Sequence, residues 1–429
     1  MKIRKRAIYF LFVLILLSTE FLHIDFFGGA LRPYHFFVPF VIFSLLRYIN
    51  KIARTGIFLA LVGFFFSSVL AALFADSSLD GFKSLGLLAA NMSIAIAVAL
   101  ILVSGNLELR HLINTALGVA IVSVLLGVVQ LVMLYAVGVD LSFTPGQTSQ
   151  LASGFAIGLK TEANTFAKFL NVVFLLMLPT FLNDKDWRRV WLAFAIIVAG
   201  MLTSFTRSAL YGLLVTLIIA YVWYFSSGRG RAIARRPLIA VVLVVITLSA
   251  FATIVVYFNP YAAHKLALFF DTEEVLEGGS SGFRLMSQGI LWDAFLTTDK
   301  TFWIGNGWGQ VRFLYDNTEM QAGGAEIVTA LAYDGLIGGM FYLLYQLTAI
   351  DSVRRIIMAN RDSAFLQASQ GVMLALIGLF VTGQITGSMN SPEYWMVLGM
   401  AIAVVVKRRK VLIEKSRQRK VSPIYSKQR

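Results

Sequence analysis

Residues 85–103 read Leu-Gly-Leu-Leu-Ala-Ala-Asn-Met-Ser-Ile-Ala-Ile-Ala-Val-Ala-Leu-Ile-Leu-Val, without a charged side chain. A bilayer core about 30 Å thick is crossed by roughly 20 apolar residues in a helix, so this stretch predicts a transmembrane span. Similar stretches are Ala7–Phe27, Tyr34–Leu46, Gly56–Phe74, Leu112–Val137, Thr165–Leu182, Val190–Ser204, Ser208–Phe225, Leu238–Tyr257, Ile327–Ala349, Phe365–Thr386 and Tyr394–Val406. The sequence therefore predicts an all-α polytopic membrane protein with about 12 spans.

The composition of the 429-residue chain points the same way, because 58% of its residues are hydrophobic and 14% are charged. A soluble domain carries about 25% charged residues. This composition excludes a soluble enzyme and a disordered or fibrous chain. The chain has no cysteine, which excludes disulfides, thiolate metal sites and thiol nucleophiles, and its four histidines lack metal-ligand spacing.

The distribution of charge predicts the topology. With twelve spans and both termini in the cytoplasm, 28 of the 37 Lys and Arg residues but only 6 of the 23 acids fall on the cytoplasmic side, as the positive-inside rule requires. The net charge of +14 is then explained by topology and by attraction to anionic membrane lipids, so no nucleic acid is expected as a partner. Residues 1–406 form the membrane domain and 407–429 a basic cytoplasmic tail.

One long segment, 259–326, is expected on the non-cytoplasmic side and is the only segment able to form an extramembrane subdomain. Within it, Phe283, Met286, Ile290 and Ala294 recur at helical spacing. The stretch Trp303–Gly309 is rich in glycine and tryptophan and predicts a turn.

Two arginines on the non-cytoplasmic side are the first candidate site residues. Arg207 stands between two predicted spans, where the positive-inside rule disfavours it, and Arg284 begins the predicted loop helix. A guanidinium is always charged, and its planar fork matches the oxygens of a phosphate. The pair therefore suggests an anion clamp for a phosphate or pyrophosphate, against the alternatives of a snorkelling Arg207 and a solvated Arg284.

Four stretches in this order resemble the superfamily of O-antigen ligases and Wzy-type O-antigen polymerases. They are Gly158-Leu-Lys-Thr-Glu-Ala-Asn164, Thr203-Ser-Phe-Thr-Arg-Ser-Ala209, Ser281-Gly-Phe-Arg284 with Ile304-Gly-Asn-Gly-Trp-Gly309, and Ala332-Tyr-Asp-Gly-Leu-Ile-Gly338. The likeness covers about residues 140–345 and implies a fold resembling GT-C membrane glycosyltransferases.

The resemblance implies transfer of a glycan from an undecaprenyl-pyrophosphate carrier at the periplasmic face of the bacterial inner membrane, with Arg207 and Arg284 on the pyrophosphate. Ligases carry a histidine at the position of Gly324, so its absence favours a repeat-unit polymerase. No paired aspartates suggest a divalent cation, and neither a metal nor a cofactor is expected. A chain-length regulator is a partner that the sequence leaves open.

The acceptor hydroxyl needs a general base, for which a carboxylate is typical. Glu326 lies nearest the position of the missing histidine and is the preferred candidate, although a helix N-terminal acid is an equal interpretation. Other candidates are Glu319, Asp316, Asp334 and Glu162.

Further substrate contacts are expected from Asn164, Lys160, Trp292, Trp308 and Arg312. The two cations would contact anionic groups, and the tryptophans would stack on sugar rings, with loop packing as their alternative.

Two other functions stay open from the sequence. A ligase or protein O-oligosaccharyltransferase would use the same donor with another acceptor. A transporter or flippase belongs to a different class and should place its essential charges near the bilayer midplane. The predicted spans carry almost no charge at mid-depth, which favours chemistry at one membrane face.

Overall fold

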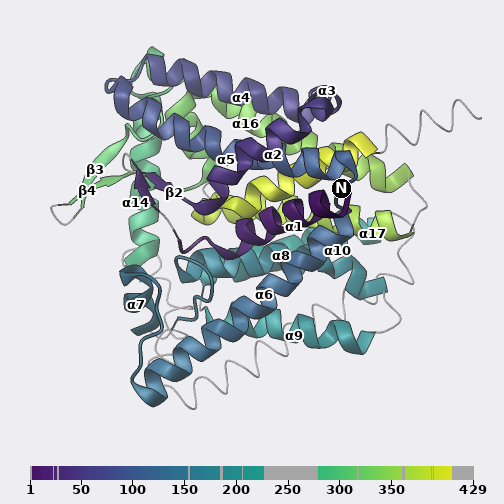
Figure 1. Cartoon of the computed structure of the whole chain (residues 1–429). Coiled ribbons are helices and arrows are strands. Elements are labelled where there is room, and N and C mark those ends of the chain that lie inside the picture. Colours follow the sequence, from purple (N-terminus) through teal and green to yellow (C-terminus); the bar gives the residue numbers. More distant parts are fainter. Residues whose placement is uncertain are drawn as a thin grey trace, which may run out of the picture.

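The structure is a computed structural model that describes residues 2–22, 24–26, 29–152, 155–183, 187–204, 206–226, 279–315, 318–359, 363–387, 389 and 391–407. Its helices form a bundle in which most axes follow one common direction (Figure 1). The predicted span Leu238–Tyr257, residues 259–278 of the predicted loop and residues 408–429 of the tail lie outside the described residues.

The elements of the first half are α1 (Lys2–Ser18), β1 (Ile24–Phe26), β2 (Gly29–Leu31), α2 (Pro33–Leu45), a 3₁₀ turn (Leu46–Tyr48), α3 (Ile49–Ile52), α4 (Gly56–Leu73), α5 (Ser78–Ser104), α6 (Leu109–Val132) with a π turn (Met133–Val137), α7 (Pro145–Ala152), α8 (Ala163–Asn183), α9 (Trp187–Thr203) and α10 (Arg207–Ser226). Those of the second half are α14 (Gly279–Leu296), α15 (Asp299–Trp303), β3 (Arg312–Tyr315), β4 (Thr318–Gln321), α16 (Glu326–Ala359), α17 (Ser363–Thr386) and a last helix over 392–407.

Among the described residues, seven helices are long and apolar enough to cross a membrane. They confirm the predicted all-α membrane architecture at positions where the sequence placed spans. Shorter apolar helices over Arg6–Ser18, Leu192–Thr203 and Ala209–Ile219 stand at three further predicted spans. The total of twelve crossings stays a prediction.

The first predicted span, Ala7–Phe27, is wrong at its C-terminal end. Helix α1 ends at Ser18, and the chain then turns through the antiparallel pair β1–β2, in which Ile24 faces Leu31. Glu20, which lies within the predicted span, forms a buried ion pair with Lys160.

Burial differs between the central and the peripheral helices. The helix over 392–407 and α8 are buried on nearly all sides, and Trp395 has no exposed surface. The peripheral helices α2 and α4 expose large apolar side chains, among them Phe40, Phe43 and Phe66. Such apolar outer faces are what a bilayer solvates, so the burial pattern agrees with a multi-pass membrane protein.

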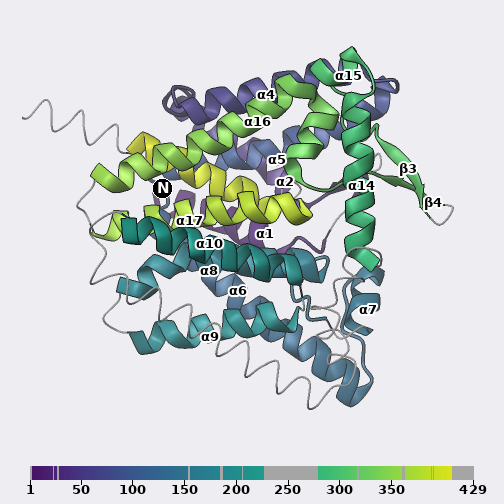
Figure 2. The same ribbon diagram turned by 180° about the vertical axis from the view of Figure 1, so that it is seen from behind.

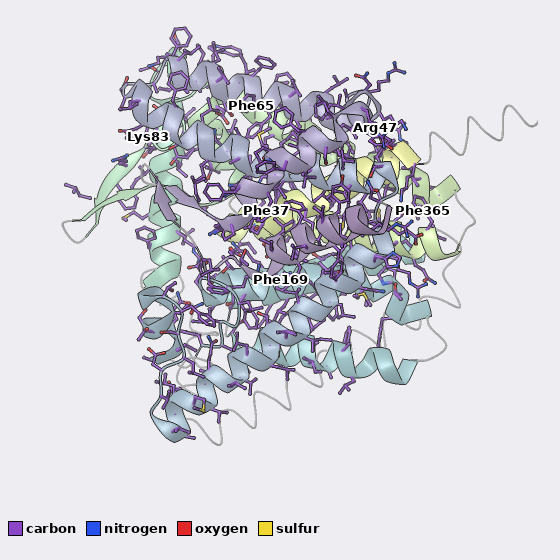
Figure 3. The ribbon with its side chains drawn as sticks, in the orientation of Figure 1. Phe37, Arg47, Phe65, Lys83, Phe169 and Phe365 are labelled. Carbon is purple, nitrogen blue, oxygen red and sulfur yellow. The ribbon has the colours of Figure 1, made fainter. Side chains whose placement is uncertain are left out.

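The two ends of the bundle differ in what they carry. The N-terminus and the end of the helix over 392–407 lie at one end, while α7, α14 and β3–β4 lie at the other, which we call the α14 end (Figure 1). Figure 3 shows Arg47 toward the first end and Lys83 toward the α14 end. The start of α1 and the end of the helix over 392–407 on one side are expected of an even number of crossings between them.

Helix α14 runs across the ends of the bundle helices, as Figure 2 shows from behind. It contains the predicted helical positions 283–294 and so confirms that prediction. Leu291 and Phe295 of α14 form a small core with Tyr333 of α16. The hairpin β3–β4, with Arg312 opposite Gln321, follows the turn after α15 and was not predicted from the sequence.

Candidate functional site

Several element ends meet at the α14 end. The Thr206 hydroxyl donates to the Ala163 carbonyl (3.3 Å), which joins the starts of α10 and α8. The Ile327 amide donates to Gln384 Oε1 (3.1 Å), which joins the start of α16 to the end of α17. Ser287 of α14 exchanges hydrogen bonds of 2.7 Å with the backbone of Gly323, three residues before α16. Segments distant in the sequence are thereby assembled around one region.

The predicted turn 303–309 docks on a kink of α16. Gly335 interrupts the helix with φ 67°, and the Asn306 and Gly307 amides donate to the carbonyls of Ala332 and Tyr333 (3.0 and 2.9 Å). Gly305 faces this kink with φ 92°, where a side chain would overlap the Tyr333 carbonyl. Glycine is required because both conformations are left-handed and the two backbones touch.

Trp308 holds the turn 303–309 against α16. Its indole N–H lies 2.9 Å from the Asp334 carboxylate, and its ring packs on Tyr333. Asp334 has no exposed surface, so this candidate base serves as a buried acceptor for Trp308. The indole is half-buried, and the stacking of Trp308 on sugar stays a prediction.

The two arginines of the predicted clamp lie in elements that meet at the α14 end. Arg207 is the first residue of α10, and its side chain lies outside the described part of the chain. Arg284 is half-buried on α14, within electrostatic range of Lys168 on α8. The clamp of Arg207 and Arg284 therefore stays a prediction.

Glu326 begins α16 and is 2% exposed. Its two carboxylate oxygens accept hydrogen bonds from the Tyr342 hydroxyl (2.6 Å) and the Met389 amide (2.7 Å). Lys168 lies within electrostatic range of this carboxylate. The side chain is thus held by two hydrogen bonds, which suits either a base or a helix-end acid.

Lys168 is a residue that the sequence analysis missed. It lies in the second turn of α8, is 7% exposed, and donates a hydrogen bond from its ammonium to the Gly387 carbonyl. The charges within its electrostatic range are Glu162, Glu326, Arg284 and Glu20. A lysine inside the predicted span Thr165–Leu182 was the signal that could have revealed it.

The surroundings of Lys160 differ from those expected of a residue that contacts an anionic substrate. Its ammonium has no exposed surface and binds Glu20 (2.7 Å) and Glu393, with the Phe169 ring 4.3 Å away. Burial alone would lower the pKa of Lys160, but the two carboxylates more than offset it and raise the pKa above the ordinary value. Lys160 therefore joins three segments of the chain inside the protein.

Arg32 completes this buried ion cluster. Its guanidinium lies 3.8 Å from Glu20 and donates to the Tyr34 hydroxyl (3.1 Å). The cluster of Arg32, Glu20, Lys160 and Glu393 contains two basic and two acidic side chains. Glu20 lies within electrostatic range of Lys168, which makes the ion cluster a neighbour of the candidate site.

The remaining residues predicted to belong to the site differ in how exposed their side chains are. Asn164 is half-buried in the first turn of α8, and Trp292 is 46% exposed on α14. Arg312 is exposed on β3 and donates from Nε to the Gly309 carbonyl (3.2 Å). Glu162 is half-buried before α8. Asp316 and the side chain of Glu319 lie outside the described residues.

Neither a metal cluster in the described residues nor a known relative identifies the function of the candidate site. Among the described residues, no three His, Asp or Glu side chains gather as a metal site would require. Neither the protein-family models nor the curated proteins contain a match to the chain. The resemblance to O-antigen polymerases and ligases therefore stays a prediction from the sequence stretches that carry it.

Proposed function

We propose that the protein is a membrane glycosyltransferase of the O-antigen polymerase type. It joins undecaprenyl-pyrophosphate-linked oligosaccharide repeat units at the periplasmic face of the inner membrane. The observation that carries this proposal is that Lys168 of α8 and Glu326 of α16 bond to the same short segment, at Gly387 and Met389, near the end of the bundle where α10 begins with Arg207. Membrane lipids surround the bundle, and the lipid-linked glycan approaches at the α14 end.

The reaction needs a site for a strongly anionic leaving group. The acceptor oxygen forms a bond to the anomeric carbon of the donor glycan, and the bond from that carbon to the carrier pyrophosphate breaks. The bonding electrons leave with undecaprenyl pyrophosphate. Arg207 and Arg284 stabilise the charge that grows on it, because a guanidinium is always charged and its planar fork matches the oxygens of a phosphate.

The proton of the acceptor hydroxyl goes to Glu326. This carboxylate is held by Tyr342 and Met389, so its orientation is fixed. A base worth roughly 10²–10⁴ in rate must be within hydrogen-bond reach of the hydroxyl, so the sugar would have to reach a carboxylate that is 2% exposed. Glu162 is the competing carboxylate because it is half-buried and lies in range of the same lysine.

Aromatic side chains on α14 suit the glycan. Trp292 is 46% exposed, and it lies on the helix that carries Arg284, about two turns further along. An exposed indole offers an apolar face to the apolar face of a sugar ring. Trp292 therefore contacts the sugar next to the pyrophosphate-binding arginine.

The proposal is tested by the surface glycan of a deletion strain complemented with plasmid-borne variants. A polymerase leaves lipopolysaccharide with a single repeat unit when it is missing, and the wild-type gene restores the ladder. A bare core would identify a ligase instead. A normal ladder in the deletion strain would reject both glycosyltransferase assignments.

A further inference from the structure

We propose that the outer face of α2, together with the turn that follows it, binds one anionic phospholipid. The phosphate of this lipid lies between Arg47 and Lys51, beside the ring of Tyr48, and its acyl chains pack on exposed phenylalanines of α2. The inference does not depend on the glycosyltransferase assignment, because Arg47 lies toward the end of the bundle opposite the α14 end (Figure 3).

The apolar half of this surface is a row of phenylalanines. Phe36, Phe40 and Phe43 are 53%, 74% and 76% exposed. Their spacing of i, i+4 and i+7 places them along one side of α2. The candidate span that contains them, Pro33–Ile52, is the least buried of the seven candidate spans in the described residues. A membrane-crossing helix with such an exposed apolar row is covered by the hydrocarbon chains of lipids.

Two cations gather where the row of phenylalanines ends. The guanidinium carbon of Arg47 lies 4.9 Å from the centroid of the Tyr48 ring, and the ammonium nitrogen of Lys51 lies 4.8 Å from it. Both side chains are exposed. Because the electron-rich ring attracts both cations, their charges are no farther apart than the sum of these two distances.

Neither cation is neutralised by a carboxylate. Within the described residues, neither Arg47 nor Lys51 forms an ion pair. Two positive charges this close repel each other, and an anion bound between them replaces that repulsion by two attractions. The guanidinium offers a planar fork to phosphate oxygens, and the ammonium offers a point charge. The pair therefore favours a phosphate as its ligand.

The continuity of the phenylalanine row with the two cations selects a lipid over a soluble anion. A phospholipid places its acyl chains in the hydrocarbon layer and its phosphate at the surface of that layer. Tyrosine, lysine and arginine are the residues that membrane proteins place at this boundary. The sequence predicts this end of the bundle in the cytoplasm, where anionic lipids attract basic residues.

The test measures lipid binding to the purified full-length protein in detergent by native mass spectrometry. Phosphatidylglycerol is the anionic lipid, and phosphatidylcholine is the lipid without net charge. The wild-type protein should retain one phosphatidylglycerol more tightly than phosphatidylcholine. Arg47→Gln and Lys51→Gln should each bind phosphatidylglycerol about 10-fold more weakly, at an unchanged melting temperature, because both side chains are exposed. Tyr48→Phe keeps the ring and should keep the affinity.

Arg354→Gln is the matched control, because it removes one positive charge that is already paired with Asp351 (2.7 Å). This charge lies at the same end of the bundle: a side chain on Gly56, which begins α4 directly after the cations, would touch Thr348, one turn before Asp351. Arg354→Gln should bind phosphatidylglycerol as the wild-type protein does.

Three results would overturn the inference. Wild-type affinity in both Arg47→Gln and Lys51→Gln would show that the two cations do not hold the lipid. An equal loss in Arg354→Gln would show a general attraction between the basic end of the protein and anionic lipids, without a site. Release of the bound phosphatidylglycerol by millimolar inorganic phosphate would identify a soluble anion as the ligand.

Discussion

The ammonium nitrogen of Lys160 lies 2.7 Å from a carboxylate oxygen of Glu20, 140 positions earlier in the chain. The same ammonium contacts Glu393, so one buried lysine joins the segments that follow α1, precede α8 and begin the central helix over 392–407. Removing one partner of a buried ion pair leaves a charge without compensation, which costs more than the pair itself contributes.

Lys160→Met should therefore destabilise the protein by about 3–5 kcal/mol. The double variant Lys160→Met with Glu393→Gln should recover most of that loss, because it removes one cation and one carboxylate and leaves Arg32 paired with Glu20. Thermal unfolding in detergent measures the stability of both variants relative to the wild-type protein. Equal melting temperatures of Lys160→Met and the wild-type protein would show that the ion cluster contributes nothing.

The second prediction concerns acid stability. Burial alone would raise the pKa of Glu20, but Lys160 and Arg32 outweigh burial and hold the pKa below its ordinary value. A lowered folded-state pKa contributes stability above the pKa of the unfolded chain, about 4.3, and this contribution is lost as the pH falls through the folded-state pKa. The wild-type melting temperature should fall between about pH 5 and 3, and Glu20→Gln should show a smaller fall. Parallel falls in both proteins would assign the effect to other groups.

The third prediction tests the contact between the turn and the kink. Gly335→Ala puts a side chain at φ 67°, where its Cβ would lie 2.4 Å from the Trp303 carbonyl. A non-glycine residue in this region costs about 1–3 kcal/mol before the overlap is added. The variant should therefore unfold at a lower temperature than Gly289→Ala. Gly289 is the control because no atom lies within 4 Å of its added Cβ.

The positions of the helices could be predicted from the apolar runs in the sequence, whereas the polar contacts between the helices could not. The sequence predicted Gly56–Phe74, and α4 covers Gly56–Leu73 because one apolar run fixes a helix by itself. Glu20 and Lys168 lie inside such apolar runs. The average hydropathy of a run hardly changes when it contains one charged residue, so these two residues were not singled out. Their roles depend on Lys160 and Gly387, which are distant in sequence and meet only in the fold.

The candidate site shows the same limit. The glycines of 303–309 predicted a turn, and Gly305 and Gly307 confirm it with positive φ. That this turn bonds to Ala332 and Tyr333 could not be derived, since nothing local in either segment specifies the other. The same holds for Glu326, whose hydrogen bond to the Met389 amide joins residues on different elements.

The fourth prediction concerns the base. Glu326→Gln keeps the shape of the side chain and removes its basicity, so turnover should fall by roughly 10²–10⁴ while donor binding changes little. Tyr342→Phe is the control, because it removes one hydrogen bond to Glu326 and keeps the carboxylate. If Glu326→Gln turns over at the parental rate and Glu162→Gln is inactive, the base is Glu162. If Glu326 is only a helix-end acid, Glu326→Gln should lower the stability of the protein by about 0.3–1 kcal/mol and leave the turnover rate unchanged.

The central claim is that arginines at the α14 end bind the pyrophosphate leaving group of a lipid-linked glycan. The most direct measurement is polymer formation by purified protein from a synthetic undecaprenyl-pyrophosphate repeat unit, with release of undecaprenyl pyrophosphate followed in parallel. The wild-type protein should produce a ladder of products. Arg207→Ala and Arg284→Ala should produce none at equal protein level, and the lysine variants should be partly active because they keep the charge but lose the fork. Full polymerisation by both alanine variants would contradict the account.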